Sequence, residues 1–119
     1  MGYIIHQGET QFKIPRENFK AAFDALTPLI EEGLAWDRKE DATDLIHRLI
    51  NLRWEPKVEK SGIVGLSFTG EKQGDEDSIF MTIAPFVEDG SFITVSGEDG
   101  DVWRYVFDGQ RCTIVLPEW

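Results

Sequence analysis

The feature that most constrains the fold is a change in the hydrophobic period near the middle of the chain. Between residues 19 and 53 the apolar side chains recur every three or four positions, as Phe19, Phe23 and Leu26 do, which is typical of amphipathic helices. From residue 64 to residue 69 apolar side chains alternate with glycine, serine and threonine, which is typical of a half-buried strand. We therefore expect helices first and mostly strands afterwards.

Helix and strand signals along the chain complete this outline. The predicted helices cover about residues 15–33, 41–53 and 77–87, and Trp54 with Pro56 ends the second one. The stretch HQGETQ, which contains Gly8, predicts a turn, and Asp108-Gly109 predicts a hairpin. This order predicts a single α+β domain spanning residues 1–119, with a C-terminal antiparallel β-meander packed by about three helices. The predicted strands are Tyr3–Ile5, Phe12–Ile14, Val64–Phe68, Phe92–Ser96, Val102–Phe107 and Cys112–Leu116.

Composition limits the classes to which the protein can belong. Its 119 residues, 41% of them hydrophobic, are enough for one hydrophobic core. A net charge of −10 and a pI near 4.5 argue against binding to nucleic acid or to an anionic membrane surface. No apolar run approaches the ~20 residues that cross a bilayer, and the start MGYIIHQGET lacks the pattern of a secretory signal. The lone Cys112 predicts a reduced, cytoplasmic location.

The negative charge is concentrated in one stretch of the sequence. Residues 1–69 carry a net charge of −2, residues 102–119 a net charge of zero, and residues 70–101 the remaining −8. Within that stretch Lys72 is the only basic residue. Its nine acids are Glu71, Asp75, Glu76, Asp77, Glu88, Asp89, Glu98, Asp99 and Asp101.

Two of the acidic turns follow strands with similar ends. TGE follows the strand that ends at Phe68, and SGE follows the strand that ends at Val95. If these strands are parallel neighbours joined by a right-handed crossover, both turns emerge at one edge of a sheet, whereas an antiparallel arrangement separates them. The sequence leaves both arrangements open. In the first, seven carboxylates share one rim: Glu71, Asp75, Glu76, Asp77, Glu98, Asp99 and Asp101.

Three aromatic residues, Trp103, Tyr105 and Phe107, alternate along one predicted strand and therefore share one of its faces. One interpretation is that they pack against the helices as part of the core. The other is an exposed platform, on which Trp103 and Tyr105 contact a partner beside the acidic rim and Arg104 pairs with an acid. Trp36 and Trp54 could extend that platform, and Trp119 is either folded back as a hydrophobic latch or available as an anchor.

Residues suited to catalysis or metal binding are sparse. The stretch GLSFT, residues 65–69, lacks the second glycine of the nucleophile motif G-x-S-x-G, and Ser67 falls inside a regular strand pattern. Cys112 with His6 or His47 would form a dyad without a defined orienting group. GDED and GEDGD offer oxygen ligands for Ca²⁺ or Mg²⁺ but do not follow EF-hand spacing. We therefore predict no enzyme, no cofactor and no dedicated metal site.

Three stretches of the C-terminal half carry a resemblance to a known group of proteins. LRWEP, LSFTGEKQGDE and GEDGDVWRYVFDG resemble small acidic proteins found in phages and in the mobile regions of bacterial genomes, from Leu52 onward. Broadly similar small acidic proteins include anti-CRISPR and other anti-defence inhibitors, and immunity proteins that neutralise toxins. The resemblance implies an inhibitor and supplies no catalytic residue.

The charge map and the resemblance lead to one functional hypothesis. Enzymes that handle nucleic acids present lysine and arginine grooves, and a rigid array of carboxylates can occupy such a groove as phosphates do. We expect a non-enzymatic inhibitor that binds a basic surface of a partner protein through the acidic rim, Trp103 and Tyr105. The alternatives are a housekeeping domain whose acidity serves only solubility, and a protein that binds Ca²⁺ or Mg²⁺ weakly.

Overall fold

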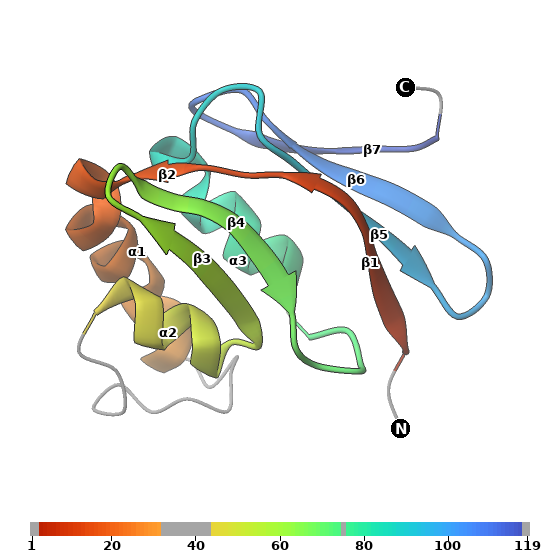
Figure 1. The fold of residues 1–119 in the computed structure, drawn as a ribbon. Coiled ribbons are helices and arrows are strands. Elements are labelled where there is room, and N and C mark those ends of the chain that lie inside the picture. The colour runs from red at the N-terminus through yellow and green to blue at the C-terminus, as the bar shows by residue number, and fades with distance from the viewer. Residues whose placement is uncertain (1–2, 32–43, 75, 118–119) are drawn as a thin grey trace.

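Two antiparallel sheets and three helices make up the described part of the chain (Figure 1). The computed structural model describes residues 3–31, 44–74 and 76–117. One sheet has the strand order β1-β5-β6-β7 and the other the order β2-β4-β3. The strands are β1 (Ile5–Gln11), β2 (Ile14–Pro15), β3 (Trp54–Glu59), β4 (Gly62–Phe68), β5 (Phe92–Gly97), β6 (Val102–Phe107) and β7 (Cys112–Val115). The helices are α1 (Phe19–Glu31), α2 (Leu45–Asn51) and α3 (Glu76–Ile83), with 3₁₀ turns η1 (Arg16–Asn18) and η2 (Ala84–Phe86).

The predicted α+β class and the C-terminal meander are confirmed. Strands β5, β6 and β7 pair antiparallel with their neighbours in chain order, and their two turns contain glycines with left-handed backbones, Gly100 (φ 93°) and Gly109 (φ 93°). The Asp108 carboxylate accepts hydrogen bonds from the backbone N–H groups of Gln110 at 2.9 Å and Arg111 at 2.7 Å. The turn chemistry read from the sequence therefore forms as expected.

The first predicted turn is wrong, because HQGETQ lies inside strand β1. This strand pairs with β5 along its length and contains a bulge between Gln7 and Thr10. A β-carbon on Gly8 would lie 3.3 Å from Cγ2 of Thr94 in β5. Gly8 therefore allows a close approach of two strands and does not mark a reversal of the chain.

Strand β3 is not predicted by the sequence, which gives Trp54 and Pro56 only as helix terminators. Helix α2 ends at Asn51, and Arg53 adopts a left-handed backbone (φ 74°) that turns the chain directly into β3. Proline is compatible with β3 because this strand lies at the edge of its sheet. At its other end α2 begins after Asp44, whose side chain accepts the N–H of His47 at 2.9 Å. The predicted start at Asp41 lies outside the described residues.

The core joins the two sheets through α3. The ring of Phe80 in α3 lies 5.2 Å from that of Trp54 in β3 and 4.8 Å from that of Tyr105 in β6, both edge to face. All three side chains are fully buried. Since one helix packs on strands of both sheets, the sheets are held in a fixed relation, and the loops at their ends are fixed with them.

Candidate functional site

The turns after β4 and β5 meet at one end of the molecule, but not for the reason expected. Strands β4 and β5 belong to different sheets, so neither of the two arrangements that the sequence left open is formed. The N-terminal segment 3–5 lies between the two turns instead (Figure 1, lower right). The N–H of Ile5 donates to the carbonyl of Glu71 at 3.0 Å, and the N–H of Glu98 donates to the carbonyl of Ile4 at 2.9 Å. The chain start thereby brings two acidic loops together.

We use the name acidic end for the exposed carboxylates at this place. Among the ion pairs found in the described residues, none involves these side chains. Lys72, whose backbone forms an isolated antiparallel β-bridge with Ile4, is the one basic residue in the sequence between residues 70 and 101. Asp75 lies outside the described residues. The members of the acidic end are Glu71, Asp77, Glu98, Asp99 and Asp101.

Neutral donors hold two of these carboxylates in place. The Tyr3 hydroxyl donates to Asp99, which also accepts the N–H of Asp101 at 3.1 Å. Glu98 accepts the N–H of Ile4 at 3.2 Å. The hydrogen bond from Tyr3, more than any other cause, lowers the pKa of Asp99. Because neutral donors orient a carboxylate without cancelling its charge, Asp99 keeps its negative charge at neutral pH.

Gly97 makes this arrangement possible. A β-carbon at this position would overlap the aromatic ring of Tyr3. The absence of a side chain lets Tyr3 pack directly on Gly97 at the end of β5 and bring its hydroxyl to Asp99. The turn then closes through the N–H of Gly97, which donates to the carbonyl of Asp101 at 2.8 Å.

A pocket of about 630 Å³ opens beside the acidic end, between the start of α3 and strands β6 and β7. Its polar lining includes the side chains of Asp77, Asp101 and Gln73, and its apolar lining includes Trp103, Ile114 and Leu116. Ile114 and Leu116 are 38% and 68% exposed, which is unusual for such large apolar side chains. The pocket therefore combines carboxylates with an aromatic and aliphatic wall.

The pocket exists because α3 is shorter than the sheet that it covers. The Tyr105 hydroxyl donates to Asp77 Oδ1 at 2.5 Å, which places the first turn of α3 over the middle of β6. Trp103 lies two residues earlier on the same face of β6, beyond the start of the helix. The apolar face of the sheet thus continues past its helical cover.

Two of the predicted contact residues are buried, so they are corrected here. Tyr105 is 0% exposed, because the aromatic face of β6 packs under α3, as the core interpretation had it. Glu76 is 3% exposed and accepts the N–H of Gly74 at 2.7 Å, since the first turn of α3 folds back on the preceding loop. Trp103, by contrast, is half-buried and lines the pocket.

The prediction that Arg104 pairs with an acid is confirmed, although the acid lies outside the acidic end. Arg104 is on the opposite face of β6 from Trp103, where its guanidinium stacks 4.3 Å from the Phe92 ring and contacts Glu9 at 3.3 Å. The tryptophans considered for the platform lie elsewhere. Trp54 is fully buried in the core, and Trp36 and Trp119 lie outside the described residues.

The segment 70–101 is not gathered as a whole. Glu88 and Asp89 follow η2, where the N–H of Glu88 donates to the carbonyl of Lys13 at 2.9 Å. Both line a different pocket together with Lys13. These two acids are therefore separate from the acidic end.

Cys112 and His47 do not form the dyad considered from the sequence. Cys112 is half-buried in β7, and burial, with a smaller contribution from the charge of Asp77, raises the pKa of its thiol to about 12. His47 contacts Asp44, with 2.9 Å between Nδ1 and Oδ1. In the described parts of the chain, no three His, Cys, Asp or Glu side chains are placed to share a metal ion. No described helix is both long and apolar enough to span a membrane.

Sequence reasoning missed Tyr3, Ile114 and Leu116 as parts of this site. The alternation of Cys112, Ile114 and Leu116 along the last strand could have indicated a shared face with Trp103. Nothing in the local sequence associates Tyr3 with Asp99, 96 positions away. A comparison of the chain with protein-family models, curated proteins and solved structures finds no significant match.

Proposed function

We propose that this chain is a non-enzymatic interaction protein that binds a basic surface of a partner protein through its acidic end. The observation that carries the proposal is the pocket in which Asp77 and Asp101 stand beside Trp103 and Ile114. A surface that served solubility alone would need no exposed apolar wall next to its carboxylates.

The charge of the acidic end accelerates association with the partner. Five exposed carboxylates at one end, without an ion pair among the described residues, create a local field that attracts a lysine- and arginine-rich surface. Such complementarity accelerates association and makes it sensitive to salt. Because hydrogen bonds already orient Asp99 and Glu98, little side-chain entropy is lost when a partner pairs with them.

The pocket slows dissociation of the complex. The aliphatic stem of a partner lysine or arginine can pack against Trp103 and Ile114 while its charged group reaches Asp77 or Asp101. Burial of such an anchor, and not the number of charges, determines how slowly a complex dissociates.

The arrangement of the carboxylates along one edge indicates the class of partner. Proteins that bind nucleic acid carry basic grooves, and an anionic edge of fixed carboxylates competes with phosphates for such grooves. Together with the resemblance to small acidic proteins of phages and mobile elements, this supports an inhibitor of the anti-defence or nucleic-acid-mimic type, acting in the cytoplasm.

A second candidate, acidity that serves only solubility, is favoured by one observation. Glu88 and Asp89 lie away from the acidic end and close to Lys13. For these two residues solvation is a sufficient explanation.

A matched pair of charge-reversal variants tests the proposal. The test variant carries Glu71→Lys and Asp101→Lys, which reverse two exposed acids of the acidic end. The control carries Glu17→Lys and Glu55→Lys, which reverse two exposed acids on η1 and β3. Both have the same net charge. A partner is first captured from host lysate at low salt, and its affinity for each variant is then measured at several salt concentrations.

We expect the test variant to bind at least about tenfold more weakly than the native protein at low salt, and the control to bind within about threefold of it. Equal losses in both variants would show that only the net charge matters, which supports the solubility candidate. Unchanged binding by the test variant would remove the acidic end from the mechanism.

A further inference from the structure

We propose that β7 is a docking edge, along which an extended segment of the partner adds as a fifth strand and places one lysine or arginine side chain in the pocket beside Trp103. This inference rests on the proposed function and specifies how the partner is held. It uses strand addition, in which main-chain hydrogen bonds give affinity and a side-chain pocket gives specificity.

The outer edge of β7 carries free backbone groups. The N–H of Asp108 donates to the carbonyl of Arg111 at 3.1 Å, which fixes the phase of the β6–β7 ladder. Because bonded and non-bonded pairs alternate in an antiparallel ladder, Thr113 and Val115 bond to β6. Cys112 and Ile114 therefore direct their N–H and C=O groups away from β6. No turn, loop or side-chain hydrogen bond within the described residues involves these groups.

The other outer strands of the two sheets are protected, and β7 is not. Strand β3 contains Pro56 and Lys57, and β2 is two residues long and contains Pro15, all of which are common devices against edge pairing. Strand β1 is covered by the second sheet, since the Gln7 side chain donates to the carbonyl of Leu66 and accepts the N–H of Phe68, both at 2.7 Å. Strand β7, Cys112–Val115, has no proline, lysine or bulge.

The pocket selects the side chain of the added strand. Ile114 lies opposite Tyr105 and therefore faces the α3 side of the sheet, where it lines the pocket with Leu116. A residue added next to Ile114 on that face lies about 5 Å away, between Ile114 and solvent. Its side chain meets the apolar wall first and the carboxylates of Asp77 and Asp101 beyond it. This order suits the long aliphatic stem and charged end of lysine or arginine.

A second copy of this chain fits the edge less well. The basic residue next to β7 is Arg111, which alternates with Cys112 and Ile114 and so lies on the opposite face of the sheet from the pocket. Pairing of two β7 strands would therefore leave the pocket carboxylates without a cation. It would also bring together two chains that each carry a charge of −10.

Synthetic peptides provide the probe. The parent peptide is a blocked hexapeptide of alternating valine and threonine with one central arginine. Two isomers carry N-methyl groups on alternate residues, so that one loses the N–H groups that face β7 and the other loses those that face solvent. Binding to the full chain is followed by amide NMR, with the Cys112 and Ile114 amides and the Trp103 indole N–H as reporters.

We expect the parent peptide to shift all three reporters and one N-methyl isomer to bind at least about tenfold more weakly than the other. Replacing arginine by glutamine should weaken binding by a similar factor. Equal affinity of the two isomers, or no shift at about 5 mM peptide, would overturn the docking edge. If both isomers bind equally but Glu71→Lys with Asp101→Lys abolishes binding, the inference fails while the proposed function stands.

A protein variant gives an independent measurement. Ile114→Pro removes an outward N–H while Thr113 and Val115 keep their bonds to β6, and Ile114→Ala removes the side chain alone. Once NMR shows both variants to be folded, the proline variant should bind the parent peptide at least about fivefold more weakly than the alanine variant. Equal affinity of the two contradicts the inference, as does a stable dimer in sedimentation whose formation is lost in Ile114→Pro.

Discussion

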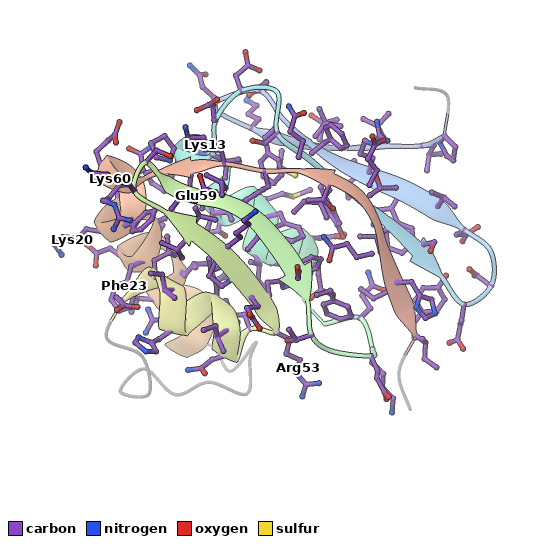
Figure 2. The ribbon with its side chains drawn as sticks, in the orientation of Figure 1. Lys13, Lys20, Phe23, Arg53, Glu59 and Lys60 are labelled. Carbon is purple, nitrogen blue, oxygen red and sulfur yellow. The ribbon has the colours of Figure 1, made fainter. Side chains whose placement is uncertain are left out.

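The two ends of the molecule handle charge differently. The end formed by η1 and the β3–β4 turn carries Lys13, Lys20, Glu59 and Lys60 (Figure 2), and Lys20 pairs with Asp24 at 3.1 Å. Charges of both signs are mixed there, and we call this the mixed end. At the acidic end neutral hydroxyl and N–H groups hold the carboxylates, and no described cation pairs with them. Charges of both signs therefore stand together at the first end, whereas the carboxylates of the other end form no ion pair among the described residues.

Backbone geometry also distinguishes the ends. At the mixed end Arg16 donates to the carbonyl of Glu59 at 2.7 Å and to that of Lys60 at 3.0 Å, so its guanidinium fixes the β3–β4 turn. At the acidic end Tyr3 fixes the β5–β6 turn by packing on Gly97. A cation thus stabilises the turn at one end, and an aromatic side chain stabilises the turn at the other.

The largest expected effect is a loss of stability caused by a substitution at the mixed end. Gly62 has φ 143°, and a β-carbon there would overlap the carbonyl oxygen of Ile14, which is backbone and cannot move aside. Gly62→Ala should therefore lower the free energy of unfolding by at least about 3 kcal/mol, measured by urea denaturation. Gly65→Ala in the same strand is the control, since its nearest neighbour would be Lys57 Cβ at 3.6 Å. Equal stability of the two variants would contradict the prediction.

The next effect concerns the contact that holds α3 next to the acidic end. Tyr105→Phe removes the hydroxyl that donates to Asp77, and we expect it to lower the free energy of unfolding by about 1 kcal/mol. In an Asp77→Asn background the same change should cost less, because the charged acceptor is already gone. A Tyr105→Phe variant as stable as the native chain in urea would show that this hydrogen bond does not stabilise the fold.

Charge removal should have opposite signs at the two ends. Glu71→Gln with Asp101→Asn relieves repulsion between like charges and should raise stability by a few tenths of a kcal/mol at low salt. Lys13→Gln with Lys60→Gln removes cations from an acidic protein and should lower stability by a similar amount. Both differences should disappear in about 1 M salt. Thermal unfolding of both double variants checks this, and changes of the same sign would argue against the distinction between the ends.

The smallest expected effect is a shift in the titration of Tyr3 at the acidic end. The hydrogen bond to Asp99, followed by burial and by the Asp99 charge, raises the pKa of Tyr3 from 10.0 to about 12. The neutral hydroxyl therefore contributes stability that is complete below pH 10 and is lost as the pH rises through 12. Asp99→Asn should move the tyrosinate absorbance toward pH 10, read in a Tyr105→Phe background that leaves Tyr3 as the only tyrosine. An unchanged titration would show that Asp99 does not control this group.

Some elements could be read from the sequence because their causes are local. Asp108 and Gly109 form a turn by themselves, and the alternation between Val102 and Phe107 requires a strand with one buried face. Strand β3 could not be read in this way, because Glu55, Pro56 and Lys57 are poor strand formers in isolation and become a strand only when β4 pairs with them. Gly8 was misread for the same reason, since its role depends on Thr94 in another strand.

The sequence by itself determined the α+β class, the C-terminal meander and the confinement of most negative charge to residues 70–101. Hydrophobic period, turn chemistry and charge count are properties of neighbouring residues, so no fold is needed to recognise them. The tertiary structure alone decided which acids meet, because Glu71 and Glu98 are joined through residues 4 and 5 and not through a shared sheet. It also decided that Tyr105 is buried while Trp103 lines a pocket, since that depends on where α3 begins over the sheet.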